Sequence, residues 1–191
     1  MTLSALTQAL RRRLAQLASD QRGVSAVEFA VLLPFMFLLY MGGVEVSQAV
    51  ATDRKVTMVA RSVADLVSRT TSVSDADMTN TFNAAAAVVA PFASSNLKVT
   101  LSSVSISALG VATVVWSNGY NTTGRAVGST VAIPTALNVA GTSLIWGEVS
   151  YAYTPTIGYV LTGTMNLTDQ MYMRPRLSSC VTRVTSNGSV C

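Results

Sequence analysis

The stretch that decides the fold is RGVSAVEFAVLLPFMFLLYMGGVE, residues 22–45, in which Glu28 is the one acid before Glu45. The 21 residues from Val24 to Val44 would span about 31 Å as a helix, which is the thickness of a hydrocarbon core. Their large apolar side chains cover every face of such a helix, whereas a buried helix of a soluble protein usually has one apolar stripe. We therefore expect a transmembrane helix over residues 24–44.

The residues on either side of the apolar run predict its orientation. Arginines at positions 11–13 and 22 precede it, and basic residues hold their side of a span in the cytoplasm. Residues from Glu45 onward are then expected outside, which in a bacterium means the periplasm. A cleavable secretory signal is the alternative, because Ala49-Val50-Ala51 has the small-x-small form of a signal peptidase site and would leave Thr52 first. The length of the apolar run and the position of Glu45 favour the anchor.

The composition argues against several classes of function. Half of the 191 residues are apolar and 12% are charged, which is too apolar for a disordered chain. The chain has no histidine and two cysteines, so the usual zinc sites and the Ser-His-Asp and Cys-His pairs cannot form. Basic and acidic side chains are mixed beyond Glu45 without a basic stripe. We expect no enzyme, no cofactor, no metal, no nucleic acid and no small-molecule substrate.

Glu28 has a candidate partner if the chain is cut after Gly23. The new α-amine of Val24 would then stand four residues before Glu28, one helical turn away on the same face. Their attraction at about 4 Å is on the order of 4 kcal/mol at an effective dielectric near 20. That offsets the roughly 3 kcal/mol that an acid costs inside a span. Without cleavage, Arg22 is the alternative partner.

These residues resemble a known family. Gly23 followed by Val24-Ser25-Ala26-Val27-Glu28-Phe29 is similar to the class III/IV prepilin cleavage pattern, a glycine followed by four residues and Glu-Phe. The longer string from Arg22 to Ala30, with Pro34, resembles the start of TadE-like proteins, the minor pseudopilins of the Flp (Tad) pilus system. Residues 147–155 and 172–176 also resemble the later part of such chains.

The resemblance implies a processing site and partners. A prepilin peptidase would cut between Gly23 and Val24, and Glu28 and Phe29 would set the register between neighbouring subunits. The implied partners are the inner membrane, the prepilin peptidase, other pilins and pseudopilins, and Tad assembly proteins. The implied fold is pilin-like.

The residues outside the span predict an α+β fold. Leu3, Leu6, Leu10, Leu14 and Leu17 recur at helical spacing and predict a short amphipathic helix at the cytoplasmic surface.

The long helix is expected to continue to about Arg69 with an apolar stripe, which packs on the chain's own domain or on other subunits. The stripe comprises Val46, Ala49 or Val50, Val56, Val59, Val63, and Leu66 or Val67. A second helix should follow an N-cap at Ser74 and stop before Pro91, with Met78 and Phe82 inward.

From residue 96 onward the pattern predicts strands. Residues 97–101 and 104–106 alternate out of phase with each other, residues 111–116 are rich in β-branched side chains, and residues 143–153 form a further strand. Ser117-Asn118-Gly119 predicts a turn into a hairpin over residues 120–126, and residues 130–141 predict a loop. We expect an antiparallel sheet of about four or five strands packed on the long helix.

The end of the chain holds both cysteines. Cys180 and Cys191 enclose Asn187-Gly188, a turn former, and in the periplasm they should oxidise, which stabilises by about 3 kcal/mol in the chain-entropy model. Two free thiols in a frayed tail are the alternative. Arg174 and Arg176, which flank Pro175, are expected at a solvated or salt-bridged strand end rather than on an acidic partner.

Taken together, the sequence predicts a cytoplasmic leader over residues 1–23, a transmembrane helix over 24–44, an extracytoplasmic helical stalk over 45–90 and a β-rich periplasmic domain over 91–191. The expected function is a minor pseudopilin of Flp/Tad pilus assembly. The alternative is a permanently anchored or secreted periplasmic binding or adhesion domain that never joins a pilus.

Overall fold

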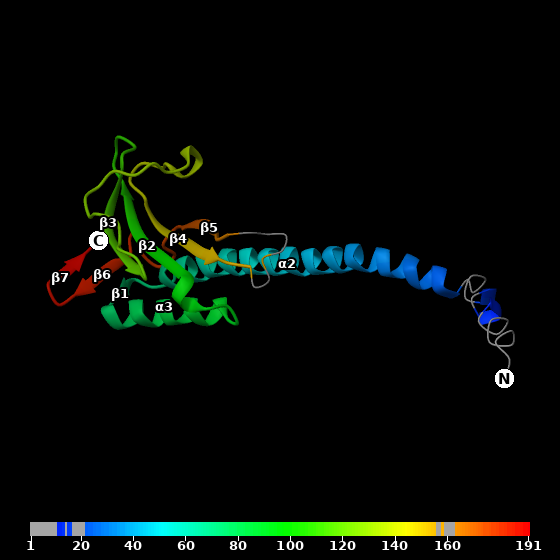
Figure 1. The fold of residues 1–191 in the computed structure, drawn as a ribbon. Coiled ribbons are helices and arrows are strands. Elements are labelled where there is room, and N and C mark those ends of the chain that lie inside the picture. Colours follow the sequence, from blue (N-terminus) through cyan, green and yellow to red (C-terminus); the bar gives the residue numbers. More distant parts are fainter. Residues whose placement is uncertain (1–10, 14, 17–21, 156–157, 159–162) are drawn as a thin grey trace. The chain divides into compact units, whose positions relative to one another are not determined.

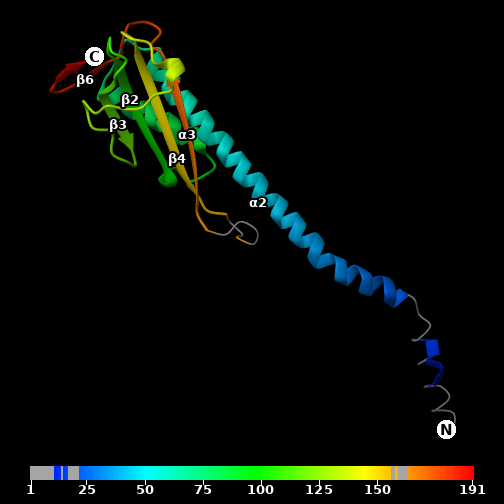
Figure 2. The same ribbon diagram turned by 90° about the horizontal axis from the view of Figure 1, so that it is seen from above.

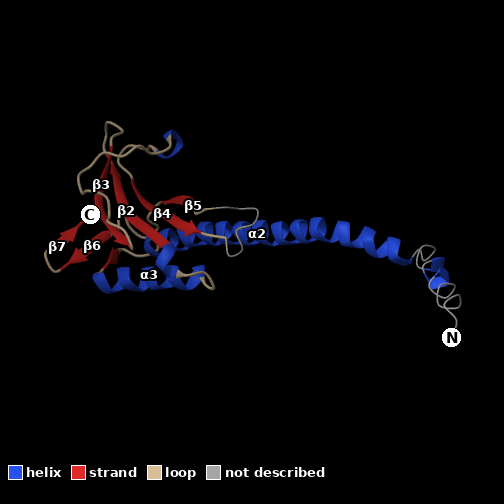
Figure 3. Ribbon diagram, in the orientation of Figure 1, coloured by secondary structure: helices blue, strands red, loops and turns tan. Residues whose placement is uncertain are grey.

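The computed structural model describes residues 11–13, 15–16, 22–155, 158 and 163–191 (Figures 1 and 3). By internal contacts the chain divides into two compact units, Met1–Val44 and Glu45–Cys191, and each is described by itself. Long and short helices combine with antiparallel sheet, so the predicted α+β class is confirmed. The leucines of the predicted amphipathic helix lie outside the described residues.

Helix α2 spans Arg22–Ser68, close to the predicted range, and contains Pro34. Within the second unit it has one buried stripe, as the spacing predicted. Val56, Val59, Val63 and Val67 are buried there. The start of the stripe was predicted wrongly: Val46 is 47% exposed, whereas Glu45 is 1% exposed. The stripe continues backward from Val56 through Thr52 and Ala49 to Glu45 in steps of three and four residues, and Val46 falls beside it.

Helix α3, Asp75–Val89, begins and ends where its local signals predicted. Ser74 is the N-cap, and its hydroxyl accepts a hydrogen bond from the Asp77 amide at 3.2 Å. The Ser74 amide in turn donates to the Asp77 carboxylate at 2.9 Å, which completes a capping box. At the other end, Lys55 of α2 donates to the carbonyls of Val88, at 3.1 Å, and Ala90. The lysine thereby satisfies carbonyls that the helix end leaves open.

The main sheet has four antiparallel strands in the order β3-β2-β4-β5, with bounds β2 Leu97–Ile106, β3 Ala112–Tyr120, β4 Ser143–Tyr153 and β5 Met165–Met173. Figures 1 and 2 show the strands side by side over the C-terminal part of α2. The register of β2 against β3 shifts between Ser103 and Val104, whereas the pairing of β2 with β4 continues without a shift. The two alternation phases in the sequence of β2 therefore reflect burial on different faces, with Leu97, Val99 and Leu101 in one cluster and Val104 and Ile106 in another.

The turn predicted at Ser117-Asn118-Gly119 is wrong, because these residues continue strand β3 and pair with β2. The chain bends back later, after Asn121, which has a positive φ of 52°. A Cβ added to Gly119 would lie 2.1 Å from the Thr122 carbonyl oxygen, so the glycine admits the returning chain rather than forming the turn. Residues 121–126 form no strand, so the second half of the predicted hairpin is absent there. The loop predicted over 130–141 is largely irregular, with one isolated bridge and the short 3₁₀ helix η2, Thr135–Leu137.

A second sheet was not predicted. It joins β1, Ser72–Val73, in parallel to β6, Thr182–Thr185, and β6 in antiparallel fashion to β7, Gly188–Val190. The central strand β6 carries Arg183, whose side chain is 4% exposed. Arg183 forms an ion pair with Asp75 and donates hydrogen bonds to the Asn118 side chain at 2.9 Å and to the Val73 carbonyl at 3.2 Å. A buried arginine with this many acceptors ties β6 to α3, β1 and β3.

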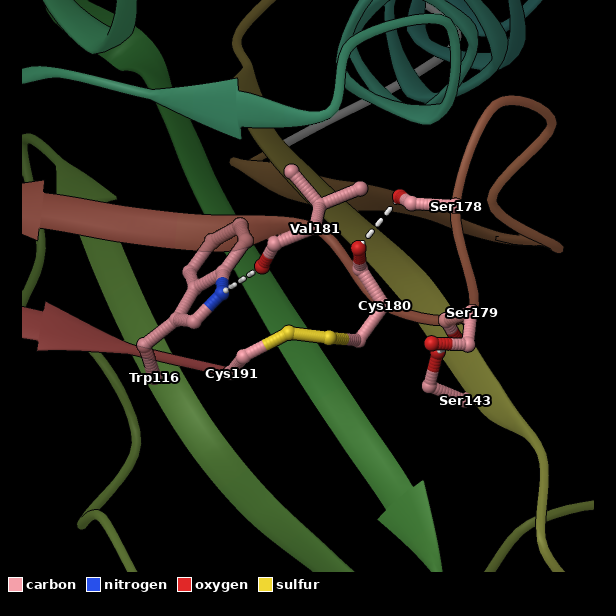
Figure 4. The surroundings of a disulfide bond; sticks show 7 residues. All are labelled: Trp116, Ser143, Ser178, Ser179, Cys180, Val181 and Cys191. Carbon is pink, nitrogen blue, oxygen red and sulfur yellow. Dashed lines mark hydrogen bonds between the residues drawn. A yellow bond between two sulfur atoms is a disulfide. The ribbon is translucent and has the colours of Figure 1, made fainter.

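Cys180 and Cys191 form a disulfide that encloses this β6-β7 hairpin (Figure 4). Next to it, the Trp116 indole donates to the Val181 carbonyl at 2.8 Å, and Val181 is fully buried. Ser178 donates to the Cys180 carbonyl on the other side. The expected bridge therefore closes the end of the chain onto the main sheet.

Two hydrophobic clusters lie on opposite faces of the sheet, because neighbouring residues of a strand point to opposite sides. The inner cluster joins α2 and α3 to Leu97, Val99 and Leu101 of β2. A smaller outer cluster contains Val104, Leu144 and Trp146, with Ile133 and Leu137 of the loop over it. The long helix thus packs on the chain's own sheet, as predicted, and the rest of the outer face carries polar side chains.

Candidate processing and packing segment

The first part of α2 exposes its apolar side chains on all sides. Within the described residues, one helix, Gly23–Ser68, is long and apolar enough to cross a membrane by length and composition. Phe29, Phe35 and Leu39 are 61%, 63% and 78% exposed. Such a surface is unfavourable in water and suited to lipid or to other helices. This helix is a candidate membrane anchor.

Gly23 and Val24 lie in the first turn of α2, which begins at Arg22. A Cβ added to Gly23 would meet no atom within 4 Å, so nothing in the fold itself requires a glycine there. Gly43, near the other end of the apolar run, is equally open. A reason for glycine at position 23 must therefore be sought outside the packing of this chain.

Glu28 lies one turn after Val24 and is exposed, beside Val27, Val31 and Leu32. No ion pair joins Glu28 to another residue among those the structure describes. Val24 is still joined to Gly23 here, so its amine is an amide and the predicted pair cannot form. Phe29 is the next residue and points to an adjacent position around the helix. The roles proposed for these four residues stay predictions.

Glu45 is a buried acid that the sequence reasoning did not identify. It lies on the stripe that continues through Ala49 and Thr52, and its charge raises the pKa of Tyr153, secondarily to the burial of that phenol. The Tyr153 hydroxyl is buried and has no hydrogen-bond partner in the described part of the chain. Extending the stripe backward by one turn would have indicated that Glu45 faces the sheet.

Of the two arginines after β5, Arg174 is exposed and Arg176 is salt-bridged, in agreement with the solvated or salt-bridged strand end that was predicted. Arg176 pairs with Asp65 of α2 at 2.7 Å, and the Arg176 amide donates to the Ser68 carbonyl at 2.8 Å. Tyr151 and Tyr153 are buried residues of the sheet. Across the described residues, no group of three or more His, Cys, Asp or Glu side chains could hold a metal ion.

The comparisons with known proteins bear on the same segment. The family model described as TadE-like protein matches residues 23–65, so the resemblance read from the sequence is confirmed over these residues. No curated protein and no solved structure matches the chain. The matched residues run from the predicted processing site through the apolar run to the buried stripe of α2.

Proposed function

We propose that this chain is a minor pseudopilin of the Flp/Tad pilus system, matured by a prepilin peptidase that cuts after Gly23. The premise is the TadE-like match over residues 23–65, which implies a protein associated with the Tad pilus and belonging to a structural family. The observation that carries the proposal is the placement of Glu28, an acid at the start of an exposed apolar helix and five residues after Gly23.

The proposed maturation supplies the charge that Glu28 needs. Cleavage converts the Val24 amide into an ammonium group one turn from the carboxylate, either on the same helix or on a packed neighbour. The attraction, on the order of 4 kcal/mol, offsets the roughly 3 kcal/mol cost of holding the acid in the membrane. An assembly whose helices lie in register would therefore be favoured over one in which the acid faces lipid.

The remaining chain fits a role in packing rather than in chemistry. The arginines at 11–13 and 22 would stay in the cytoplasm with the peptidase, and the unit from Glu45 onward would lie in the periplasm. Exposed Val46, Val50 and Met58 continue an apolar surface along α2 beyond the span. This surface would contact other pilins and Tad assembly proteins.

The secretory alternative would cut α2 after Ala51. That cut would remove Glu45 and Ala49, which belong to the compact second unit, and Glu45 is 1% exposed there. A cleavage that leaves the buried stripe incomplete should destabilise the domain. The place of these residues in the folded unit therefore supports the prepilin type of processing, which would leave the whole stripe intact.

The test is the amino terminus of the protein recovered from cells that carry the Tad system, measured by mass spectrometry. We expect Val24 as the first residue. Gly23→Leu should leave the leader attached, whereas the matched variant Gly43→Leu, at an equally open helical position, should be processed as usual. Met1 as the first residue would contradict the proposal in favour of a permanent anchor, and Thr52 would contradict it in favour of secretion.

A further inference from the structure

The part of α2 that belongs to the second unit carries a shallow, mostly apolar groove of about 420 Å³. Two rows of side chains at four-residue spacing border it. One row is Val46, Val50, Arg54 and Met58, and the other is Ser47, Ala51 and Lys55. The buried stripe of the same helix faces the sheet, so by helical periodicity the groove faces away from the chain's own core.

The shape of this groove suits a second helix. Side chains four residues apart form ridges on a helix, and the groove between two such ridges accepts a ridge of a neighbouring helix. Val46, Val50 and Met58 are 47%, 47% and 50% exposed, so their apolar surface is open to such a neighbour. The backbone of a helix is bonded within the helix, so this side of α2 offers no edge to which a strand could add.

Two arginines give this side of α2 a charge that the chain itself leaves unbalanced. Arg54 lines the groove, and Arg61 follows it by seven residues, so both lie on one side of the helix with Met58 between them. Both arginines are exposed. Among the residues that the structure describes, neither guanidinium takes part in an ion pair or a hydrogen bond.

The charged residues nearest to these arginines do not balance them. Lys55 is a further cation, and it donates to the carbonyls at the end of α3. Asp65, one turn beyond Arg61, is already shared by Arg69 and by Arg176, the latter at 2.7 Å. Asp53 is exposed, but it lies about 100° around the helix from the next residue, Arg54. The groove side therefore presents two open cations at a fixed spacing.

A second copy of this chain does not supply the missing negative charges. Two copies anchored in one membrane run parallel, and a two-fold axis between their α2 helices would bring Arg54 opposite Arg54 and Arg61 opposite Arg61. Like charges placed opposite each other across an interface are strongly unfavourable. In any other parallel pairing, the second copy would need two acids at matching spacing, and no two of the nine acids in the sequence are seven residues apart.

Lipid phosphates are another source of negative charge, but they fit the position of Arg61 poorly. Arg61 follows Val44, the end of the apolar run, by 17 residues, which correspond to about 26 Å of helix. The headgroup layer on one side of a bilayer is only about 5–7 Å thick. A protein partner that extends beyond the membrane can reach both arginines.

From this arrangement we infer that the groove binds a parallel helix of a different membrane-anchored protein, which carries an apolar ridge and a carboxylate opposite each of Arg54 and Arg61. Because the helices run parallel, the two acids of the partner stand seven residues apart, about 10.5 Å along the axis. The apolar ridge supplies contact area, and the two ion pairs set the register and exclude basic helices. The inference rests on the proposed function, which places this chain beside other anchored proteins, and it names the chemistry of the partner.

The test is photo-crosslinking of the full chain in cells that carry the Tad system, with p-benzoylphenylalanine in place of Met58. We expect a cross-link to a helix of another membrane-anchored protein, in which mass spectrometry finds two Asp or Glu residues seven apart. The same photo-reactive residue in place of Leu109, which is 91% exposed in a turn after β2, should not give this cross-link. Cross-linking to this chain itself, to lipid alone, to no molecule, or to a segment without two such acids would overturn the inference.

Charge reversal decides whether the arginines select the partner. Arg54→Glu combined with Arg61→Glu should lower the yield of the cross-link at least about tenfold, because each acid of the partner then meets a like charge. Changing the two acids of the partner to Lys should restore the yield. Lys98→Glu combined with Arg174→Glu makes the same change of net charge at exposed positions outside α2 and should leave the yield unchanged.

Arg54→Gln combined with Arg61→Gln removes the attraction without adding repulsion, and it is the second variant if the reversed one does not accumulate. It should give a yield between those of the natural and the reversed chains. Equal yields from the natural, neutralised and reversed chains would overturn the inference. Val24 as the first residue without a cross-link at Met58 would remove the partner helix alone. Met1 as the first residue with the expected cross-link would remove the proposed processing and keep the partner helix.

Discussion

Glu28 is the residue whose side chain the proposed function uses most directly. Replacing Glu28 with Ala should leave membrane insertion intact, because it removes a polar group from the apolar helix. It should lower the amount of the protein that purifies with pili by at least about tenfold. A tenfold loss corresponds to about 1.4 kcal/mol, which is less than the proposed attraction between Glu28 and the Val24 amine. Cell fractionation and pull-down of the major pilin would measure both quantities.

The matched control is Asp53→Ala, which removes an exposed acid of the same helix outside the apolar run. It should leave the recovery with pili unchanged. Equal recovery of Glu28→Ala and the natural chain would remove the registration role from Glu28, even if the amino terminus proves to be Val24.

At the scale of single residues, the sequence could identify candidate functional residues whose neighbours in the chain mark them out. Gly23, Val24, Glu28 and Phe29 stand out because a basic segment and an apolar run flank them directly. Glu45 and Arg183 were missed, because their burial depends on strands more than a hundred residues away: Glu45 lies near Tyr153, and Arg183 contacts Val73 and Asp75. A charged residue usually lies at the surface, so composition alone predicted the opposite.

Among the elements, α3 is stabilised at its start by a capping box that depends on pH. Hydrogen bonds from the Ser74 backbone, and then from its side chain, lower the pKa of Asp77. A carboxyl whose pKa is lower when folded contributes fully above its unfolded pKa, near 4, and this contribution is lost as the pH falls through the lower folded value. We expect Asp77→Asn to flatten the fall of the melting temperature below about pH 4.

Circular dichroism melts at several pH values between 3 and 7 would check this prediction. Ser74→Ala removes the hydroxyl partner and should flatten the same part of the profile. An unchanged profile in both variants would mean that the cap contributes no pH dependence to the fold.

The contact of α2 with β4 depends on a glycine. A Cβ added to Gly147 would lie 3.1 Å from the Ala60 carbonyl oxygen and 3.3 Å from the Val63 side chain. Gly147→Val should therefore push the helix from the sheet and lower the free energy of unfolding by about 1–3 kcal/mol. Tryptophan fluorescence during denaturation would measure the change, because Trp116 and Trp146 both lie in the sheet.

Ala152→Val is the comparison variant, on the same strand but on the opposite, half-exposed face. It should change the stability by no more than about 0.5 kcal/mol. Equal effects of the two changes would mean that the close approach of α2 at Gly147 does not limit the packing.

The elements with strong local signals were predicted well from the sequence. Helix α3 has a cap, inward residues at helical spacing and a proline after its end, and all three signals lie within its own sequence. The small sheet was missed because β1 has two residues and pairs with a strand over a hundred residues later. The turn predicted at Ser117-Asn118-Gly119 was wrong because a glycine in a strand can allow a neighbouring backbone to approach closely as readily as it forms a turn.

On the scale of the whole molecule, the first unit is the proposed membrane anchor and the second unit contains the folded core. Every described member of the two hydrophobic clusters lies at Ala49 or later, and so does the disulfide. The family match, in contrast, covers residues 23–65 and joins the apolar run to the first part of the folded unit. The segment that the TadE-like family model matches is thus the part that would contact the membrane and neighbouring subunits under the proposed function.

This division predicts that a version of the chain beginning at Met41 folds alone. It keeps one turn before the buried Glu45 and the complete stripe of α2, while it lacks most of the apolar run. Without the apolar run it should be monomeric in water, because the apolar surface that remains at Val46, Val50 and Met58 is small and includes Arg54 and Lys55. Its melting temperature should differ from that of the full chain in nanodiscs by less than about 3 °C, roughly the shift that 1 kcal/mol gives a domain of this size.

Size-exclusion chromatography and calorimetry would check both expectations, with a version beginning at Thr52 as the comparison. The shorter version loses Glu45 and Ala49 from the stripe, so it should melt at a lower temperature than the one beginning at Met41. Equal melting temperatures would show that the buried start of the stripe contributes nothing to stability, and the structural argument against secretion by cleavage after Ala51 would then fail. Aggregation of the version beginning at Met41 would show instead that the second unit needs the apolar run to fold.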